Sequence, residues 1–282
     1  MKSTENNAGY TKRKTLTHGK TIDLVGRLHS DIFFQEKLLL NGVGMRVKLV
    51  RNRDNFVLHS SGVATNYRIN IVKAVLRVRK VRVAPVVSLG HAAALETGNA
   101  KYPINRVECK TFSIQTGMQS VTQEQVFQGQ LPSRIVIGCA DHDAFDGMYT
   151  KNPYNFKHYK MTKLSLEVDT LAGTKTIVSD FDNGLIAEGY MSLFIGARKA
   201  FKDEDLDVTR DDFVGGFALY CFDLTPDLGE SDHYSLVKNG SVRLHLSFAE
   251  ALRQTINVIV YGEFQNVLEV DRNRNVFYDF SA

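Results

Sequence analysis

Residues 241–248, SVRLHLSF, and residues 255–264, TINVIVYGEF, are two β-rich runs separated by a short gap. Further runs of this kind recur at steady spacing toward the N-terminus, and Gly, Pro or Asn occurs in almost every gap. They cover residues 106–114, 120–127, 134–139, 161–168 and 217–224. Many short strands separated by turn residues are typical of a β-sandwich or barrel. These runs therefore predict an all-β fold.

The first third of the chain also shows the period-two alternation of half-buried strands. It is present over residues 20–28 and 42–50, and most clearly over residues 67–83, where apolar and basic residues alternate from Leu76 to Val83. Pro85 then predicts the start of a helix that runs to Leu95. Helical pieces are also predicted near residues 189–201 and 209–216, the second with a modest N-cap signal at Thr209.

Composition places the chain among ordinary globular proteins. Of its 282 residues, 43% are hydrophobic and 23% are charged, which excludes an intrinsically disordered protein. No apolar run approaches the roughly 18 residues of a membrane helix, and residues 1–7 lack the apolar region of a signal peptide. The three cysteines are far apart and odd in number, which argues against a disulfide scaffold. We therefore expect reduced thiols in a protein that is neither membrane-spanning nor secreted.

Charge is distributed unevenly along the chain. Residues 1–100 carry 17 Lys and Arg against 6 Asp and Glu, net +11, whereas residues 201–282 carry 7 against 15, net −8. This polarity indicates a surface that faces nucleic acid or charge matching between neighbouring subunits. The other interpretation is that both ends face solvent and bind nothing.

No motif in the sequence argues for an enzyme. Walker A, GxGxxG, GxSxG and HExxH motifs are all missing, and the histidines are dispersed. Residues 141–147, DHDAFDG, do not match an EF-hand loop, because the third Asp comes one residue late and position twelve is Asn152. No carboxylate in the sequence is indicated as the third member of a catalytic triad with His245 and Ser247. We predict no catalytic, cofactor-binding or metal-binding residues.

Four long strings of residues carry a resemblance to a known family. They are residues 99–110, 147–159, 202–228 and 257–276, in the family's order. Together they resemble the capsid proteins encoded by Polinton (Maverick) elements and their adintovirus-like relatives, which are similar to the double jelly-roll major capsid proteins of double-stranded DNA viruses. The resemblance implies a structural protein of a virion, or a truncated or domesticated remnant of one. It also implies homotrimeric capsomers, a penton-like minor capsid protein as partner, and location in a virion or in the host nucleus or cytoplasm.

The chain is too short for two jelly rolls, since one roll with long loops needs about 150–200 residues. We therefore predict one complete antiparallel eight-stranded jelly-roll sandwich over residues 67–282, with one to three short helices in its loops, equivalent to the C-terminal roll of a double jelly-roll protein. Residues 20–66 are predicted to be the terminal strands of an incomplete first roll. Residues 1–19 are predicted to be a flexible basic arm.

For a capsid protein the functional surface is the subunit interface. Aromatic residues of the loop over 147–159 are candidate contacts, with packing against their own sandwich as the other interpretation. Charged candidates lie on the basic 67–83 run, on the acidic run that follows residue 201, and near the C-terminus, where a local turn is the other interpretation. The full set is Arg77, Arg79, Arg82, Tyr149, Tyr154, Phe156, Tyr159, Asp205, Asp207, Arg272 and Arg274.

Two other functions remain as alternatives. A nucleic-acid-binding module would use the basic first third, including Arg77, Arg79 and Arg82, although these lack the interleaved aromatics of many such surfaces. A carbohydrate- or protein-binding β-sandwich is the other alternative, because jelly rolls also serve as lectins.

Overall fold

The computed structural model describes residues 11, 14–16, 20–60, 66–169, 173–200, 206–226 and 236–278. Its helices are η1 (Asp31–Phe33, a 3-10 turn), α2 (Asp54–Val57), α3 (Pro85–Thr97), α4 (His142–Asp146), α5 (Ala187–Gly196) and α6 (Arg210–Gly216). Its strands are β1 (Ala100–Ile114), β2 (Ser120–Gln130), β3 (Arg134–Asp141), β4 (Met161–Val168), β5 (Lys175–Val178), β6 (Leu219–Asp223), β7 (Asn239–Phe248), β8 (Ile256–Val270) and β9 (Val276–Phe277).

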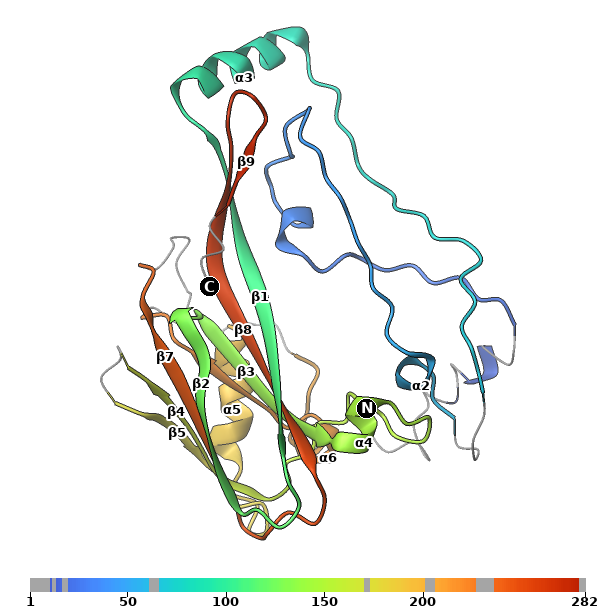
Figure 1. Ribbon diagram of the computed structural model, residues 1–282, viewed down its shortest axis with the longest axis vertical. Coiled ribbons are helices and arrows are strands. Elements are labelled where there is room, and N and C mark those ends of the chain that lie inside the picture. The colour runs from blue at the N-terminus through green and yellow to red at the C-terminus, as the bar shows by residue number, and fades with distance from the viewer. Residues whose placement is uncertain are drawn as a thin grey trace.

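The strands form two antiparallel sheets. The first sheet has the order β1-β8-β3-β6, with β9 beside β8, and the second sheet has the order β2-β7-β4-β5. Strand β1 pairs with β8, β2 with β7, β3 with β6 and β4 with β5. This nested order is that of one long antiparallel ribbon rolled into two facing sheets, the jelly roll. The predicted eight-stranded jelly-roll sandwich is therefore confirmed, with its first strand at Ala100 (Figure 1).

The core lies between the two sheets and follows from alternation along the strands. In β7, every second residue from Val242 to Phe248 is buried, while Arg243 and its alternating neighbours face outward. The rings of Phe127 and Phe264 meet edge to face with centroids 5.4 Å apart. Gly262 permits this contact, because a Cβ there would lie 2.7 Å from the Phe127 ring. Burial of one face of each sheet therefore fixes the register of the sandwich.

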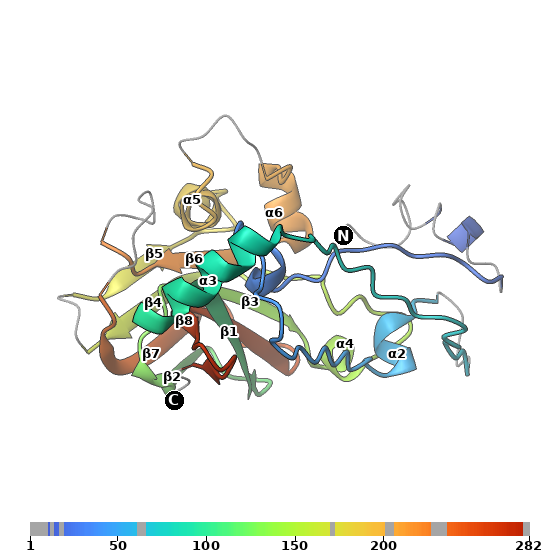
Figure 2. The ribbon, with the colours of Figure 1, turned by 90° about the horizontal axis from the view of Figure 1, so that it is seen from above.

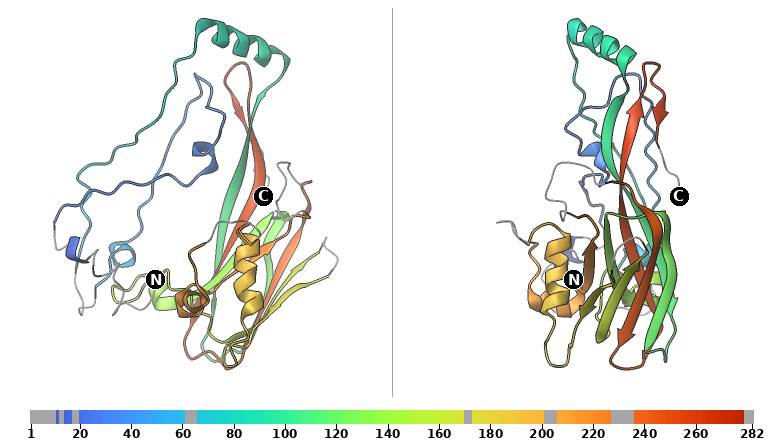
Figure 3. Two further views of the ribbon diagram at one scale, coloured as in Figure 1. Left: turned by 180° about the vertical axis from the view of Figure 1, so that it is seen from behind. Right: turned by 90° about the vertical axis from the view of Figure 1, so that its left-hand side faces the viewer.

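Two helices lie on the side of the sandwich where β5 and β6 form the edges (Figure 3). Helix α5 packs against both of these strands. Helix α6 begins with a capping box, in which Thr209 Oγ1 accepts from the N–H of Asp212 and the Asp212 side chain accepts from the N–H of Thr209. The helices predicted near residues 189–201 and 209–216 are both present, as is the one predicted from Pro85.

Strands β1 and β8 are paired along all of both strands and extend beyond the sandwich as a two-stranded tower (Figures 1 and 3). Helix α3 lies above the tip of this tower. It is apolar, yet Val86 is 80% exposed and Leu89 is 73% exposed, and Leu95 is its one buried residue. Among the described residues, no helix combines the length and the apolar character needed to cross a bilayer.

The strands predicted over residues 20–28, 42–50 and 67–83 are not present, and this prediction was wrong. These residues run as extended chain beside the tower without ladder partners (Figures 1 and 2). Alternation specifies two faces of a strand but does not supply a neighbour to pair with. Apolar side chains consequently remain in solvent, with Leu24 86% exposed and Val72 76% exposed.

Candidate interaction surfaces

Tyr149 and Tyr154 lie in the loop between α4 and β4, where both contact the N-terminal segment of the same chain. The hydroxyl of Tyr149 donates to the main-chain oxygen of Tyr67 at 3.2 Å, and the two rings meet edge to face. The ring of Tyr154 meets that of Phe56 in the same way, with centroids 5.9 Å apart, but remains 62% exposed. The two tyrosines therefore form an interface within the chain, and their role between subunits stays a prediction.

Phe156 and Tyr159 pack against their own sandwich instead. The N–H of Phe156 donates to the oxygen of Gly216 at 2.9 Å. Its ring covers Gly138 on β3, where an added Cβ would lie 2.7 Å from the ring. Tyr159 packs on the core. For these two aromatics, the structure matches the alternative that they close the end of their own sandwich.

Asp141, at the end of β3, is a buried carboxylate that joins this loop to the sheet. It accepts hydrogen bonds from Lys157 Nζ at 2.7 Å, from the Tyr159 hydroxyl at 2.5 Å, and from the Gln254 side chain. Burial raises its pKa, but the hydrogen bonds from Lys157 and Tyr159 outweigh burial and hold the pKa of Asp141 below its usual value. Within the described ranges no group of three or more His, Cys, Asp or Glu residues could hold a metal ion.

The basic candidates lie on the extended segment of residues 66–84. Arg77, Arg79 and Arg82 are all exposed. Residues 67–83 hold six Lys and Arg and no acidic residue. In the described part of the chain, none of these three arginines forms a salt bridge. The segment is therefore a continuous basic surface.

The acidic candidates lie before α6. Asp205 falls outside the described residues. Asp207 is exposed and has a positive φ of 52°, in the turn that leads to Thr209. The subunit contact predicted for Asp207 stays a prediction.

The C-terminal candidates belong to the turn between β8 and β9. The Asp271 carboxylate accepts from the N–H of Asn275 at 2.8 Å and from its side-chain amide at 2.9 Å. Arg272 is exposed, whereas Arg274 is half-buried with its side chain over Gly42. The turn is thus closed by the side chains of Asp271 and Asn275 and by the N–H of Arg274, which donates to the oxygen of Asp271 at 3.1 Å, in agreement with the local-turn interpretation.

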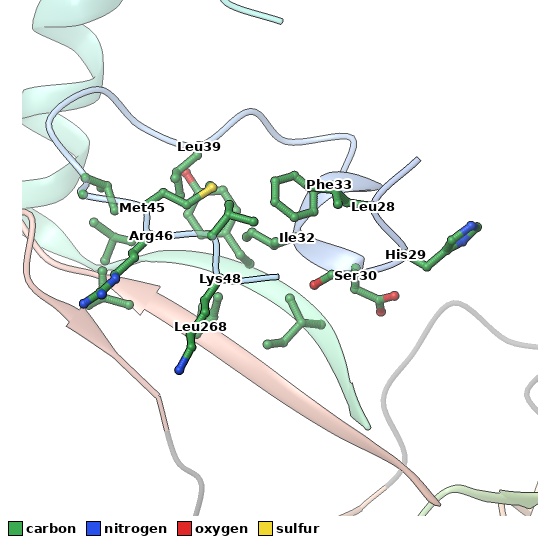
Figure 4. A pocket seen from close by; sticks show the side chains of 18 of the residues that line it. Leu28, His29, Ser30, Ile32, Phe33, Leu39, Met45, Arg46, Lys48 and Leu268 are labelled. Carbon is green, nitrogen blue, oxygen red and sulfur yellow. The ribbon is translucent and has the colours of Figure 1, made fainter. Parts of the chain in front are cut away.

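An open apolar cavity of about 510 Å³ lies between the tower and residues 28–49. Leu39, Ile32 and Phe33 line it from the N-terminal segment, and Leu268 lines it from β8 (Figure 4). Met45 lies on the same segment and is still 49% exposed. A space of this size and lining accommodates several apolar side chains or a small apolar molecule.

The contact between η1 and β1 was not predicted from the sequence. The N–H of Asn105 donates to Asp31 Oδ2 at 2.8 Å. The Tyr102 hydroxyl donates to the oxygen of Leu38 at 3.2 Å. One signal could have indicated it, because Pro103 within a strand marks an edge that faces something other than a ladder partner.

His245 lies on the outer face of the second sheet, between two hydroxyls. One ring nitrogen is 2.9 Å from Thr122 Oγ1 and the other is 3.1 Å from Ser247 Oγ. In a catalytic triad a carboxylate orients the imidazole for nucleophilic catalysis, whereas here the Thr122 hydroxyl occupies that position. The three residues therefore form a polar ladder across β2 and β7.

The three cysteines lie on separate strands of the first sheet, and all three are free thiols. Cys139 and Cys221 are buried, and burial raises the pKa of each to about 12. Cys109 on β1 is exposed. It is thus the one accessible thiol among the described residues.

Comparison with known proteins gives one sequence relative and several solved structures. No protein-family model matches the chain. An uncharacterized protein of Caenorhabditis elegans is 23% identical over 275 residues, which cover 92% of this chain and 63% of the nematode protein. The chain therefore spans less than two thirds of that relative.

The solved structures are of viral proteins. A chain of the Sputnik virophage is 12% identical with a TM-score of 0.41, and the overlap covers 64% of this chain and 39% of that one. The mavirus major capsid protein is 12% identical with a TM-score of 0.37, covering 64% and 41%. The PBCV-1 virus capsid is 10% identical with a TM-score of 0.38, covering 65% and 52%. The strand order, rather than these partial overlaps, identifies the jelly roll.

Proposed function

We propose that the chain is a structural protein of the viral major capsid type, related to the Polinton-encoded capsid proteins, and that it acts by self-association. The observation that carries the proposal is the nested order of eight strands in two facing sheets. Further support comes from the four family-like strings, which occur in the family's order. The proposed assembly is a homotrimer, with a penton-like minor capsid protein as a further partner, in a virion or in the host nucleus or cytoplasm.

Residues 20–66 are proposed to complete a second sandwich rather than to act alone. Their alternating apolar side chains, such as Leu24 and Leu49, are exposed in this chain. Protein interiors are close-packed, so the cavity between residues 28–49 and the tower would be explained by side chains of a further layer that are missing there. A neighbouring β-sheet would bury both features at once.

Charge is proposed to guide the subunits together. Long-range attraction between the basic surface with Arg77, Arg79 and Arg82 and the acidic last third, which includes Asp205 and Asp207, would orient two subunits as they approach. Arg272 and the exposed ring of Tyr154 lie on surfaces open to a neighbour. Exposed ion pairs contribute only about 0.2–1 kcal/mol each, so charge would steer and orient while apolar contacts hold the subunits.

Sedimentation velocity over a wide range of protein concentration, followed by electron microscopy of the largest species, tests the proposal. We expect discrete oligomers of trimer size. A chain that remains monomeric at the highest concentration would overturn the proposal. Titration with duplex DNA at low salt addresses the alternative, because phosphate-driven binding weakens steeply with salt and needs no oligomer.

A further inference from the structure

Three of the four edge strands of the sandwich are protected against pairing with another strand. In β2 the register shifts between Gln123 and Phe127, and Gln125 has a positive φ of 51°, so the strand is bulged. Strands β5 and β6 have only 4 and 5 residues, and α5 packs against both. Bulges, short strands and a covering helix are the usual means by which soluble proteins prevent edge-to-edge pairing.

The remaining edge, that of β1, is protected only in its upper half. Pro103 has no N–H, its carbonyl accepts a hydrogen bond from Gln35, and the N–H of Asn105 is bound by Asp31. Strand β1 keeps an unbroken register with β8 over its whole length. The N–H groups therefore point alternately toward β8 and away from it, and those of Val107, Cys109, Thr111 and Ser113 point away, as that of Asn105 does.

We call Val107–Ser113 the lower edge of β1. No described residue pairs with its outward main-chain groups. It lies on the side of the sandwich opposite α5, where Phe112 and Val121 are only partly buried against the core. The fold thus leaves one long, regular strand edge open next to incompletely covered apolar side chains.

The same chain carries an unpaired segment that fits this edge. In residues 72–79, Val72, Ala74, Leu76 and Val78 alternate with Lys73, Val75, Arg77 and Arg79, without Pro or Gly. Eight extended residues span about 26 Å and the seven residues of the lower edge about 23 Å. All eight residues are exposed and outside any strand.

We propose that the lower edge of β1 is paired, in the assembled protein, with residues 72–79 of a second copy of the chain. The apolar side of the added strand would cover Phe112 and Val121, and Arg77 and Arg79 would face outward. This inference rests on the self-association proposed above and names its contact.

A second copy satisfies the open edge and the unpaired strand together. The two features belong to different surfaces of one chain, so the contact is head-to-tail and closes into a ring when the rotation permits. Within its own chain the segment is held apart from β1, because Tyr67 at its start is bound to Tyr149. At its other end it leads into α3 above the tower (Figure 1).

The first test is Thr111→Pro in the full chain. The Thr111 N–H points away from β8, so proline there removes no internal ladder bond and its ring obstructs only an added strand. We expect a nearly unchanged melting temperature and self-association weakened about tenfold or more. Lys110→Pro is the matched control, because that N–H points into the ladder and its loss should lower the melting temperature strongly.

The second test is cross-linking through the exposed Cys109. A chain with Cys109→Ser and Arg77→Cys is mixed with a tagged chain that keeps Cys109, and a short bis-maleimide is added. The buried Cys139 and Cys221 should not react. We expect a cross-link between the two chains, and none when Lys163→Cys, on the outer face of the second sheet, replaces Arg77→Cys.

The outcomes separate this inference from the proposed function. Oligomers that persist with Thr111→Pro and give no cross-link would place the contact elsewhere and overturn the inference alone. A concentration-independent cross-link within one chain that carries both Cys109 and Arg77→Cys would show that the occupant is the chain's own segment, which also overturns it. A monomeric wild-type chain would overturn both proposals.

Discussion

A single carboxylate, that of Asp141, connects the loop after α4 to the end of the first sheet. Its folded-state pKa is lowered, so it stabilises the fold fully above its unfolded pKa of about 4, and this contribution is lost as pH falls through the folded value. We expect Asp141→Asn to lower the free energy of unfolding by about 2 kcal/mol at pH 7, because hydrogen bonds to charge are lost.

Urea unfolding at pH 7 and at pH 3 measures this effect. The wild-type protein should lose more stability between the two pH values than the Asp141→Asn variant does. Asp143→Asn is the matched control, since Asp143 is an exposed carboxylate whose ion-pair partner among the described residues is Lys151, and the substitution should change stability by less than about 0.5 kcal/mol. Equal acid sensitivity of wild type and Asp141→Asn would contradict the role given to Asp141.

A second residue-scale prediction concerns Gly196, at the end of α5. A Cβ at this position would overlap the side chain of Cys221 on β6. We expect Gly196→Ala to destabilise the fold by about 1–3 kcal/mol through overpacking. Gly215→Ala in α6 is the control, because nothing lies within 4 Å of its added Cβ, and it should stabilise the protein by about 0.5–1 kcal/mol. Thermal melts of both variants check the prediction, and similar effects of the two substitutions would refute it.

At the scale of elements, local sequence signals located most of the sandwich. The run over Met161–Val168 coincides with β4, and the signal at Thr209 is a capping box in the structure. Strand β5 was not predicted, because its four residues, Lys175–Val178, are too few to show a period. Local pattern was sufficient wherever the chain itself supplies the neighbouring strand.

The same signals over-predicted strands in the first third, since pairing depends on a partner that no local pattern encodes. Contacts between distant segments, such as Asp31 with Asn105, were missed for the same reason. Tyr149 and Tyr154 were predicted to contact a neighbouring subunit, and that role stays a prediction. The structure shows them in contact with Tyr67 and Phe56 of their own chain, a long-range contact that the local sequence could not indicate.

The unpaired state of residues 67–83 has a measurable consequence for proteolysis. Six basic residues lie there on exposed chain without ladder hydrogen bonds. We therefore expect brief trypsin treatment of dilute protein to cut within this segment, and within residues 20–28 and 42–50 that are unpaired in the same way, before it cuts at the Lys and Arg of β1 to β8. Mass spectrometry of the first fragments identifies the site. Initial cleavage inside β3 or β8 would contradict the prediction, and protection of residues 67–83 at high protein concentration would match pairing with a second copy.

For the whole molecule, the uneven charge predicts how subunits meet. A first third of net +11 and a last third of net −8 give each copy a basic and an acidic region. Head-to-tail approach then brings opposite charges together, whereas head-to-head approach does not. Long-range attraction raises association rates and is screened by salt, with a Debye length of about 8 Å at physiological ionic strength. Molar salt should therefore slow association far more than it dissociates formed oligomers.

Two pairs of charge-reversal substitutions test whether association depends on a local basic contact or only on net charge. Arg77→Glu with Arg79→Glu reverses the proposed contact surface, while Lys163→Glu with Arg253→Glu makes the same change on the sandwich. We expect the first pair to slow association about tenfold, by removing the attraction that orients the encounter, and the second to have a much smaller effect. Stopped-flow light scattering at low salt gives both rates. Equal slowing by the two pairs would mean that only total charge matters, so that residues 67–83 guide no particular contact and the charge gradient faces solvent.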